Sequence, residues 1–337
     1  METKGFLNKI ADKQNLTKKE SSFLLEQIIS GQLSPSQIAA VLMGLRTKGE
    51  SVEEILGFIK TMRKHMIKIF APNAIDIVGT GGDGIGTFNI STTSSLVVAG
   101  GGVRVAKHGN KASSSLCGST DVLEALGVNI NLTPYQTEKV LTSIGMTFLF
   151  APLYHPAMKN IAPIRRELGI RTVFNFLGPF LNPASTKRQL IGVPNTDIAK
   201  KLAKVATNLN YDHLLIVTSI DGMDEITTTG QTTVFEIKNT KSRSYQISPQ
   251  QFGIKKANKK NLLGADAKKN AEDIMSILKG EKGPKRDIVI LNSAAAFYVA
   301  GRVKNIKMGI RLADKSIDSG AALKTLKNLI KESNKYA

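Results

Sequence analysis

The stretch GTGGDGIGTFNIST, residues 79–92, decides the fold class of this chain. It follows a short run rich in β-branched residues, 74–78, and leads into the apolar residues 96–99. A strand that ends in a glycine-rich loop and is followed by a helix is the repeating unit of α/β domains. The sequence therefore predicts an α/β domain that binds its ligand at this loop, beyond the carboxyl end of the strand.

Gly79, Gly81 and Gly84 form a literal G-x-G-x-x-G pattern, but its context argues against a dinucleotide-binding loop. In such a loop the third glycine opens a helix, and an acidic residue about twenty positions later binds the ribose. Here the residues after Gly84 are too rich in glycine to begin a helix, and the next strand ends in Lys107 and His108. The pattern therefore indicates a loop shaped for another phosphate compound.

The same loop carries groups suited to binding an anion. Glycines let backbone N–H groups approach a phosphate closely, and a helix N-terminus favours negative charge. Asn89, Ser91 and Thr92 stand at the start of the expected helix, and Thr87 adds another hydroxyl. Asp83 would repel bare phosphate, so we expect it to bind ribose hydroxyls or metal-bound water. The alternative is a polar turn with ordinary helix caps.

Two further segments suit a phosphate compound and its metal ion. Residues 107–115, KHGNKASSS, follow the next expected strand, whose end faces the same side as the glycine loop in a parallel sheet. Asp221, Asp224 and Glu225 follow the expected strand 214–217, and carboxylates opposite a polyphosphate are natural Mg²⁺ ligands, to which Ser91 of the first loop could add an oxygen. The alternative for each segment is a solvated loop.

A fourth segment, residues 162–183, mixes arginines with phenylalanines and turn residues. An arginine binds a carboxylate through two parallel hydrogen bonds, and phenylalanines can line a flat aromatic ligand. The same composition also fits a helix surface followed by a loop. We expect Cys117, the single cysteine, to be a small packing residue rather than a nucleophile.

Helical patterns alone occupy residues 1–70, where capping boxes begin at Thr17 and Ser51 and Pro35 suits the first turn of another helix. Farther along, strands alternate with helices. The expected helices there include 121–126 and 134–144; the expected strands are 74–78, 103–106, 146–150, 214–217 and 287–291, with an added hairpin of 232–237 and 244–247. The fold class is therefore α/β, with a small N-terminal helical domain and a larger α/β domain that has a mostly parallel central sheet.

Composition narrows the class of protein. The chain has 337 residues, of which 42% are hydrophobic, so it can bury a substantial core. It shows no secretory signal and no apolar run long enough to span a bilayer, so we expect a soluble, cytoplasmic protein without membrane partners. The net charge of +19 fits a nucleic-acid partner, an anionic substrate or a lysine-rich surface. The densest basic runs, 255–260 and 282–286, hold no aromatic residue that could stack on bases.

Taken together, these motifs resemble the anthranilate phosphoribosyltransferase family. The matching stretches occur in the family's order: GTGGDGIGTFNIST, KHGNKASSSLCGSTDVLEALG, RRELGIRTVFNFLGPFLNP and DGMDE. The resemblance is dense over residues 79–229 and looser through LNSAAAFYVAG, 291–301. Single motifs are shared with pyrimidine nucleoside phosphorylases, but the combination is specific to the first family.

The resemblance implies a nucleoside phosphorylase/phosphoribosyltransferase-like fold, with a helical domain at 1–70 joined by part of 160–185 and an α/β domain at 74–337. It implies a site in the cleft at the hinge and a homodimer formed through the helical part. It also implies the reaction, in tryptophan biosynthesis: phosphoribosyl pyrophosphate and anthranilate give N-(5-phosphoribosyl)anthranilate and pyrophosphate, with Mg²⁺ as cofactor.

The resemblance also implies roles for individual residues. The expected donor-binding residues are Gly79, Gly82, Asp83, Thr87, Asn89, Ile90, Ser91, Thr92, Lys107, His108, Gly109, Asn110, Lys111, Ala112, Ser113, Ser114, Ser115 and Ser119. The expected anthranilate-binding residues are Gly79, Asn110 and Arg165, and the expected metal ligands are Ser91, Asp224 and Glu225. His108, His155 and Pro179 are expected to line the path of anthranilate. Lys111 replaces an arginine of many relatives, which keeps a cation but not a bidentate contact.

The expected chemistry relies on positioning and charge stabilisation, without a covalent intermediate. No general base is assigned, and His108 is the candidate for the proton acceptor. A rival enzyme function is nucleoside phosphorolysis, which needs no acidic metal pair. A rival of another class is a nucleic-acid-binding relative without transferase activity, motivated by the net charge of +19. Retention of Asn110, Arg165, Asp224 and Glu225 argues against this binding function, so a nucleic-acid partner is not expected.

Overall fold

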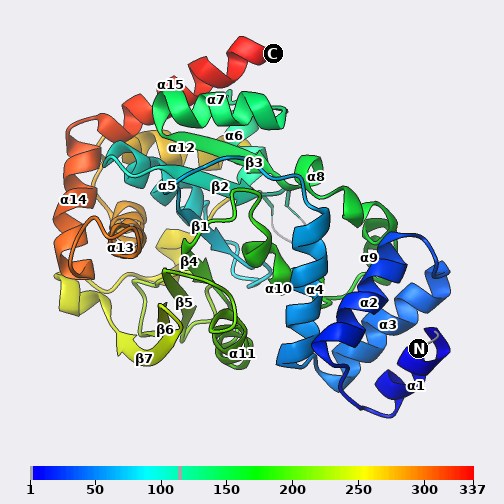
Figure 1. Ribbon diagram of the computed structural model, residues 1–337. Coiled ribbons are helices and arrows are strands. Elements are labelled where there is room, and N and C mark those ends of the chain that lie inside the picture. The colour runs from blue at the N-terminus through cyan, green and yellow to red at the C-terminus, as the bar shows by residue number, and fades with distance from the viewer. Residues whose placement is uncertain (1–2, 113–115) are drawn as a thin grey trace. The chain divides into compact units, whose positions relative to one another are not determined.

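The computed structural model describes residues 3–112 and 116–337, which divide into two compact units (Figure 1). A helical unit comprises Met1–Ile67 and Pro152–Leu181, and an α/β unit comprises Lys68–Ala151 and Asn182–Ala337. The helical unit contains α1 (Thr3–Ala11), α2 (Lys18–Ile29), α3 (Pro35–Lys48), α4 (Val52–His65), α8 (Ala151–Tyr154), η1 (Pro156–Asn160), α9 (Ala162–Leu168), α10 (Phe174–Leu177) and η2 (Gly178–Leu181).

The helix starts predicted for the helical unit are confirmed. Thr17, Ser34 and Ser51 each accept a hydrogen bond from the backbone N–H three residues later, and the residue there returns a bond to the cap. These reciprocal bonds satisfy N–H groups that have no partner inside the helix. The Glu54 carboxylate also accepts from the N–H of Leu16 at 2.8 Å and pairs with Lys48 at 2.8 Å, which ties α4 to its neighbours.

The α/β unit begins after residue 67 and resumes after residue 181. Its elements in chain order are β1 (Asp76–Gly79), α5 (Ile90–Gly100), β2 (Val105–Gly109), α6 (Ser119–Ala125), α7 (Pro134–Ile144), β3 (Met146–Phe150), β4 (Arg188–Gly192), α11 (Thr196–Ala206), β5 (His213–Ser219), β6 (Thr232–Lys238), β7 (Lys241–Ile247), η3 (Pro249–Phe252), η4 (Lys259–Leu262), α12 (Ala267–Leu278), α13 (Pro284–Val299), α14 (Ile306–Asp318), α15 (Ala321–Ser333) and η5 (Asn334–Tyr336). Among the described residues, no helix is both apolar enough and long enough to cross a membrane.

The sheet of the α/β unit is parallel where the expected site lies. Its strand order is β1-β4-β5-β6-β7, with parallel pairs from β1 to β5 and antiparallel pairs from β5 to β7. A parallel pair of β2 and β3 joins β1 through a bridge between Ile75 and Val105. The loops after β1, β2 and β5 therefore leave the sheet at the same edge, because parallel strands share the direction of their carboxyl ends.

Helices α5 and α13 cover part of this sheet with apolar side chains. α5 packs against β1, β2 and α13, and α13 in turn packs against β4 and β5. The buried residues of these elements belong to one hydrophobic core, which includes Leu96, Val217 and Leu291. This core fixes the strand ends from which the candidate site is built.

The hairpin expected at 232–237 and 244–247 is confirmed as β6 and β7, whereas the strand expected at 287–291 is wrong. Residues 287–291 lie inside α13, a 16-residue helix that is buried on nearly every side. A short apolar run cannot distinguish a buried strand from a buried helix by its periodicity, and here the longer apolar stretch decides for a helix. Conversely, β4 at Arg188–Gly192 was not predicted.

Candidate active site

The glycine loop after β1 and the loop 221–225 after β5, called the acidic loop below, meet in the α/β unit. The backbone N–H of Gly81 donates a hydrogen bond of 2.7 Å to Oδ2 of Asp224. A Cβ on Gly79 would lie 2.2 Å from the same oxygen, and a Cβ on Gly192 would lie 1.5 Å from the backbone oxygen of Asp224. Glycine is therefore required at both positions because the acidic loop packs directly against the backbone.

Backbone conformation explains the other glycines of the loop. Four of them have φ between +69° and +74°, a region that favours glycine: Gly81, Gly82, Gly84 and Gly86. Between them, Asp83 accepts a hydrogen bond of 3.0 Å from the N–H of Ile85 through Oδ1. Its Oδ2 is buried and has no hydrogen-bond partner in the structure, so this oxygen remains available for a ligand.

Lys107 connects β2 to the same place. Its Nζ donates to the carbonyl oxygen of Ile77 at 2.8 Å and to Oγ of Ser91 at 3.3 Å, and the side chain is 1% exposed. Burial lowers the pKa of Lys107, and the carboxylates of Asp76, Glu225 and Asp224 oppose that shift. The lysine expected at the site is therefore present, but its side chain is buried between the loops after β1, β2 and β5 instead of lying on a solvated surface.

The two carboxylates after β5 are also buried. Asp224 and Glu225 are 9% and 8% exposed. Burial raises the pKa of Glu225 well above its ordinary value, the negative charge of Asp224 adds to this, and Lys107 and the N–H of Ser91 partly offset it. Two adjacent buried carboxylates and the buried oxygen of Asp83 leave excess negative charge, which a bound cation would neutralise.

Asp224 and Glu225 fit a Mg²⁺ ion that is bound partly by the protein and partly by the phosphates of a substrate. Oxygen donors suit this ion, which commonly takes one or two protein carboxylates and completes its coordination with water and phosphate. Within residues 3–112 and 116–337, no three His, Cys, Asp or Glu side chains are grouped so that they could hold a metal alone. Asp221, the third acidic residue of the motif, already has partners within the loop: its Oδ2 accepts hydrogen bonds from the hydroxyls of Thr227 and Thr229.

The loop after β2 is closed by hydrogen bonds from α6. Oδ2 of Asp121 accepts from the N–H of Ala112 at 2.9 Å and from the N–H of Gly118 at 2.8 Å. The carbonyl oxygen of Asn110 accepts from the hydroxyl of Ser119 at 3.3 Å. These bonds bring the two ends of the loop together. The expected donor-binding residues Ser113, Ser114 and Ser115 lie outside the described residues.

Lys111 and Asn110 face different surroundings in this loop. Nζ of Lys111 lies 3.3 Å from Oε2 of Glu124, in an ion pair whose side chains are both partly exposed. Oδ1 of Asn110 accepts from the N–H of Lys111 at 2.8 Å. The side-chain amide nitrogen of Asn110 is therefore oriented by its own loop, whereas Lys111 forms an ion pair that solvent can replace.

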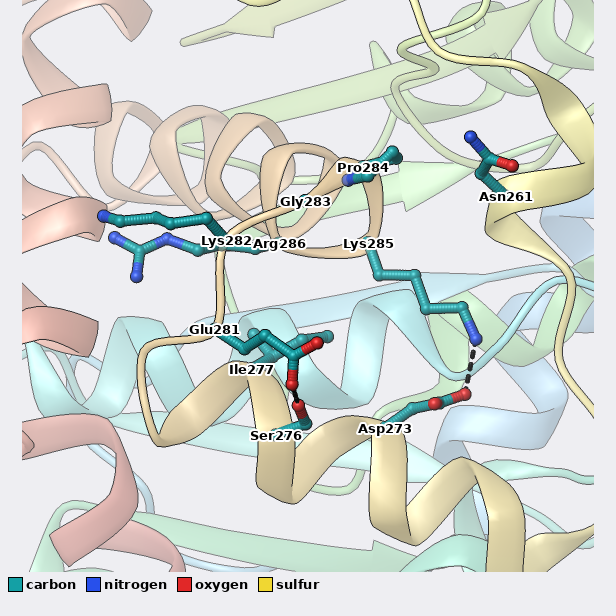
Figure 2. Close-up of a pocket in the computed structure, with 10 residues that line it drawn as sticks. All are labelled: Asn261, Asp273, Ser276, Ile277, Glu281, Lys282, Gly283, Pro284, Lys285 and Arg286. Atoms are coloured by element: carbon teal, nitrogen blue, oxygen red, sulfur yellow. Dashed lines mark hydrogen bonds and ion pairs between the residues drawn. The ribbon is translucent and has the colours of Figure 1, made fainter.

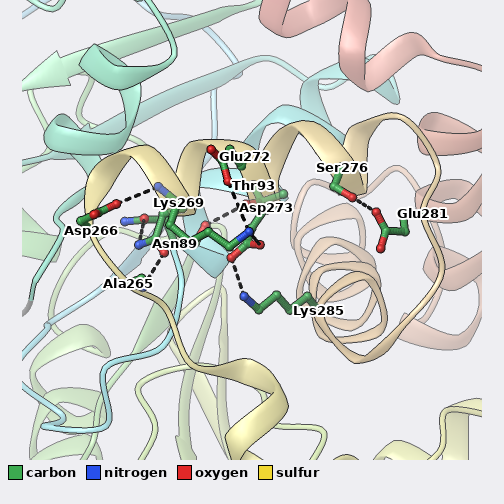
Figure 3. Close-up of polar contacts among 11 residues, drawn as sticks. Asn89, Thr93, Ala265, Asp266, Lys269, Glu272, Asp273, Ser276, Glu281 and Lys285 are labelled. Carbon is green, nitrogen blue, oxygen red and sulfur yellow. Dashed lines mark hydrogen bonds and ion pairs between the residues drawn. The ribbon is translucent and has the colours of Figure 1, made fainter.

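The start of α5 joins the glycine loop to α12. Oδ1 of Asn89 accepts from Nδ2 of Asn270 at 3.0 Å and from the Cys117 thiol at 3.4 Å. Oδ1 of Asn270 accepts from the N–H of Ala265 at 2.8 Å, and Figure 3 shows Asn89 and Ala265 at the start of α12. Oγ1 of Thr92, one turn along the helix, is buried without a partner in the structure. Cys117 is buried and its pKa is raised by burial, as expected for a packing residue.

Arg165 lies on α9 of the helical unit and is held by its own neighbours. Its Nη2 donates to Oδ1 of Asn175 at 3.3 Å, and its guanidinium lies 5.5 Å from the ring centre of Phe174. Nε is buried and has no partner in the structure, and burial lowers the pKa of the group. An oriented guanidinium with an unused donor is suited to a carboxylate ligand.

The histidines named in the sequence analysis are both buried. His108 is 5% exposed, and its backbone N–H donates to Oδ1 of Asp76 at 3.3 Å, inside the α/β unit. His155 lies in the helical unit, as does the buried Pro179, and burial lowers the pKa of His155 to about 4. His155 is therefore neutral near pH 7, so it can line a path for a ligand without adding charge.

Three buried residues that hydrogen-bond to the loops of the site were missed by sequence reasoning. Ser219 and Asn292 hydrogen-bond to the backbone of the acidic loop, and Asn270 hydrogen-bonds to Asn89. Asn292 is an amide inside the apolar run 288–297, which is a signal that the sequence offered. Ser219 and Asn270 stand in ordinary polar contexts, so nothing local distinguishes them.

A separate cavity of about 230 Å³ opens beside the start of α13 (Figure 2). Among its residues, Lys285 pairs with Asp273 and Ser276 hydrogen-bonds to Glu281. It is lined by Asn261, Asp273, Ser276, Ile277, Glu281, Lys282, Gly283, Pro284, Lys285 and Arg286. None of the expected site residues is in this lining, so the cavity is distinct from the loop cluster.

The chain matches two models of the same family along most of its length. The model described as the a/b domain of the glycosyl transferase family matches residues 71–323, and the model described as its helical bundle domain matches residues 4–66. Together they cover both regions in which the sequence predicted domains.

Proteins of known name are similar over nearly the whole chain. An anthranilate phosphoribosyltransferase of Thermoanaerobacter sp. (strain X514) is 50% identical over 326 residues, 96% of each chain. One of Rhodopseudomonas palustris (strain BisB5) is 48% identical over 328 residues, 97% of each chain.

Solved structures with the same name share the fold. The enzyme of Thermus thermophilus has a TM-score of 0.91 at 37% identity, covering 97% of this chain and 99% of that one. The enzyme of Saccharomyces cerevisiae in complex with PRPP and Mg has a TM-score of 0.91 at 29% identity, covering 99% and 98%. With this identity over nearly its full length and the same fold, the chain belongs to the anthranilate phosphoribosyltransferase family.

Proposed function

We propose that this chain transfers the phosphoribosyl group of phosphoribosyl pyrophosphate to the amine of anthranilate, giving N-(5-phosphoribosyl)anthranilate and pyrophosphate in tryptophan biosynthesis. The observation that carries the proposal is the meeting of the glycine loop with buried Lys107, Asp224 and Glu225 at the ends of parallel strands. A glycine loop suits a phosphate, and the buried acids suit the cation that accompanies a diphosphate. Family membership supports the same reaction.

The donor is assigned to the loops after β1 and β2, with the donor-binding residues named in the sequence analysis, which lie between Gly79 and Thr92 and between Lys107 and Ser119. Backbone N–H groups at the start of α5 and in the glycine loop favour the phosphate oxygens. The buried Oδ2 of Asp83 and Oγ1 of Thr92 have no protein partner. The carboxylate oxygen can accept a hydrogen bond from the sugar, and the hydroxyl can donate or accept one. Lys107 is placed to hold Ser91 and to offset negative charge.

Ser91, Asp224 and Glu225 are the residues that would hold Mg²⁺, whose chemical contribution is to neutralise charge on the departing pyrophosphate. A yeast relative whose structure contains PRPP and Mg supports this assignment. Burial raises the pKa of Glu225, and a positive charge nearby opposes that shift, as Lys107 already does. Metal binding and donor binding are therefore expected to depend on one another.

Anthranilate is assigned to Arg165, Gly79 and Asn110. Arg165 would bind its carboxylate, since its Nε lacks a protein partner and Asn175 and Phe174 orient the guanidinium. A structure of the yeast relative with 4-fluoroanthranilate, 28% identical with a TM-score of 0.88, supports an anthranilate-like ligand for this family. His155 is neutral near pH 7, so it leaves the positive charge of Arg165 as the attraction for the acid.

In the reaction, the bond from the anomeric carbon to the pyrophosphate oxygen breaks, and the amine nitrogen forms a bond to the same carbon. The aromatic amine is already neutral at pH 7, so it attacks without prior deprotonation and loses a proton afterwards. A preorganised hydrogen-bond donor facing the leaving group can contribute about 3 kcal/mol. No side chain is assigned as the base, and His108 remains the candidate that the sequence offers.

The test is an anthranilate fluorescence assay with purified full-length protein, phosphoribosyl pyrophosphate and Mg²⁺. We expect the anthranilate signal to fall only when all three are present, with one pyrophosphate released for each anthranilate consumed. Omitting the donor or chelating Mg²⁺ is the control. No loss of signal, together with DNA binding that weakens with salt, would favour a binding protein instead. Release of base from a nucleoside with inorganic phosphate would favour phosphorolysis.

The assembly, location and domain limits of the chain are proposals as well. We infer a homodimer formed through the helical unit from the family resemblance, and a cytoplasmic location as expected in the sequence analysis. We also infer domains at 1–70, joined by part of 160–185, and at 74–337, which the division into a helical and an α/β unit supports. Sedimentation velocity on the purified chain tests the dimer, and a monomer at micromolar concentration would contradict it.

A further inference from the structure

The peptide unit between Glu225 and Ile226 is held at both of its edges by side chains. Its carbonyl oxygen, which belongs to Glu225, accepts a hydrogen bond of 2.5 Å from the hydroxyl of Ser219. Its N–H, which belongs to Ile226, donates a hydrogen bond of 3.0 Å to Oδ1 of Asn292. Rotation of this peptide plane would break both bonds at once.

Asn292 reaches this loop from the middle of α13 and is completely buried. Its Nδ2 donates to the carbonyl oxygen of Ile226 at 2.9 Å and to the carbonyl oxygen of Ile288, one turn earlier in α13, at 2.9 Å. The amide therefore makes three hydrogen bonds that fix its own orientation. Two of the three go to one residue, so Asn292 binds both the N–H and the carbonyl group of Ile226.

Contacts of Asp224 restrict the movement of the acidic loop where it faces the glycine loop and β4. Asp224 accepts from the N–H of Gly81, and its backbone oxygen lies where a Cβ on Gly192 would stand. The Glu225 side chain thus leaves a backbone that contacts β4, the glycine loop and α13, with little freedom to change its direction. A metal ligand held by a hydrogen-bonded outer shell binds more tightly, because the ligand is oriented before the ion arrives.

Resting on the proposed function, we propose that Asn292 and Ser219 are positioning residues that aim the Glu225 carboxylate at the metal ion of the donor. Both side chains are shielded from solvent, and so from a substrate in solution: Asn292 of α13 is 0% exposed, and Ser219 is 5% exposed. Their effect passes through one peptide bond to the carboxylate. The expected result of losing them is weaker metal binding, with anthranilate binding unchanged.

The chain offers a matched control one residue away. Ser293 lies on α13 next to Asn292 and is equally buried, but its hydroxyl has no hydrogen-bond partner in the structure. Ser293→Ala therefore removes a buried polar atom from the same helix without touching the acidic loop. Any effect of a changed α13 as such would appear in both variants, whereas loss of positioning would appear only at Asn292.

The experiment measures Mn²⁺ binding to the full-length protein by the electron paramagnetic resonance signal of free Mn²⁺. Inorganic pyrophosphate is present, and a protein-free sample with the same pyrophosphate gives the Mn²⁺ that pyrophosphate binds by itself. Mn²⁺ takes the same oxygen ligands as Mg²⁺. For Asn292→Ala we expect the Mn²⁺ affinity to fall roughly 10- to 100-fold, as is usual when an outer-shell partner is lost. Half-saturating Mg²⁺ in the transferase assay should rise by a similar factor, while the KM for anthranilate stays within about twofold.

Two further variants keep the test decisive if Asn292→Ala does not fold. Ser219→Ala removes only the hydrogen bond at the other edge of the peptide and should weaken Mn²⁺ binding in the same direction. Asn292→Asp keeps the side-chain shape, and when protonated it retains one donor and one acceptor, so it should restore part of the affinity.

The outcomes separate this inference from the proposed function. Mn²⁺ affinities of folded Asn292→Ala and Ser219→Ala within twofold of the wild type would overturn the inference and leave the proposed function intact. An equal loss in Ser293→Ala would overturn it as well, because the effect would then belong to α13 in general. Absence of Mn²⁺ binding and transfer in the wild type would overturn both.

Discussion

The backbone N–H of Gly81 donates a 2.7 Å hydrogen bond to the Asp224 carboxylate, although the two residues are 143 positions apart in the sequence. This bond joins the glycine loop after β1 to the acidic loop after β5. It places the groups expected for the phosphates of the donor beside the groups expected for its metal ion. A substitution in one loop should therefore change the conformation of the other.

A methyl group at Gly79 should disturb the acidic loop. The Cβ of Gly79→Ala would lie 2.2 Å from Oδ2 of Asp224, so the carboxylate must move. We expect the KM for the donor and the half-saturating Mg²⁺ concentration to rise at least tenfold in the fluorescence assay. Gly178→Ala is the control, because its backbone is helical and a Cβ there would meet no atom within 4 Å. Normal kinetics of Gly79→Ala would contradict the packing described here.

Removing the carboxylate charges should alter the dependence on metal. In the double variant Asp224→Asn and Glu225→Gln, we expect turnover to fall by at least a hundredfold and the Mg²⁺ requirement to shift to much higher concentrations, because neutral amides are poor ligands for this ion. Another adjacent acidic pair, Glu272 and Asp273 on α12, provides the control when changed to Gln and Asn. If the Mg²⁺ titration of the first variant matches that of the wild type, these residues are not metal ligands.

Arg165 should contribute to the binding of anthranilate and not to the binding of the phosphoribosyl donor. Arg165→Ala should raise the KM for anthranilate roughly 10- to 100-fold, since hydrogen bonds to charged groups contribute about 1.5–3 kcal/mol. Donor binding, measured by the thermal shift that phosphoribosyl pyrophosphate induces, should remain close to that of the wild type. The exposed neighbour Arg166, changed to Ala, serves as the control. An equal loss for both substrates would remove Arg165 from its assigned role.

Stability in acid should depend on Glu236, which lies in β6 away from the candidate site. Its carboxylate accepts from Tyr298 at 2.7 Å and from Arg243 at 2.8 Å and contacts His213 at 2.8 Å, and these partners outweigh burial and lower its pKa to about 2. A lowered folded-state pKa stabilises the protein above the unfolded value near 4.5, and this contribution is lost as pH falls toward 2.

Urea unfolding of the wild type and Glu236→Gln between pH 3 and pH 7 checks this dependence. We expect the wild type to be more stable by about 2 kcal/mol at neutral pH, with the difference shrinking steadily below about pH 4.5. Glu332→Gln, which removes a helix-surface ion pair with Lys335, should change stability by less than about 0.5 kcal/mol. A difference that stays constant down to pH 3 would show that the charge of Glu236 is not responsible.

Local signals in the sequence were enough for much of the fold. Capping boxes at Thr17 and Ser51 predicted helix starts, because the residues that satisfy the first N–H groups lie within one turn of each other. The glycine loop predicted a strand end followed by a helix. The run 287–291 was assigned to a strand in error because both a buried helix and a buried strand are apolar on all sides.

For the candidate site too, local sequence signals predicted some features and only the structure revealed others. The sequence alone determined which residue types form the candidate site, since the glycine, lysine and acidic motifs are each continuous over a few residues. Only the tertiary structure decided that Lys107 is buried against Ser91, that Asp221 accepts hydrogen bonds from its own loop, and that Asn292 hydrogen-bonds to the backbone of Ile226. These contacts depend on strand order and on the packing of α13, and no pattern within a short stretch of chain encodes the approach of residues so distant in sequence.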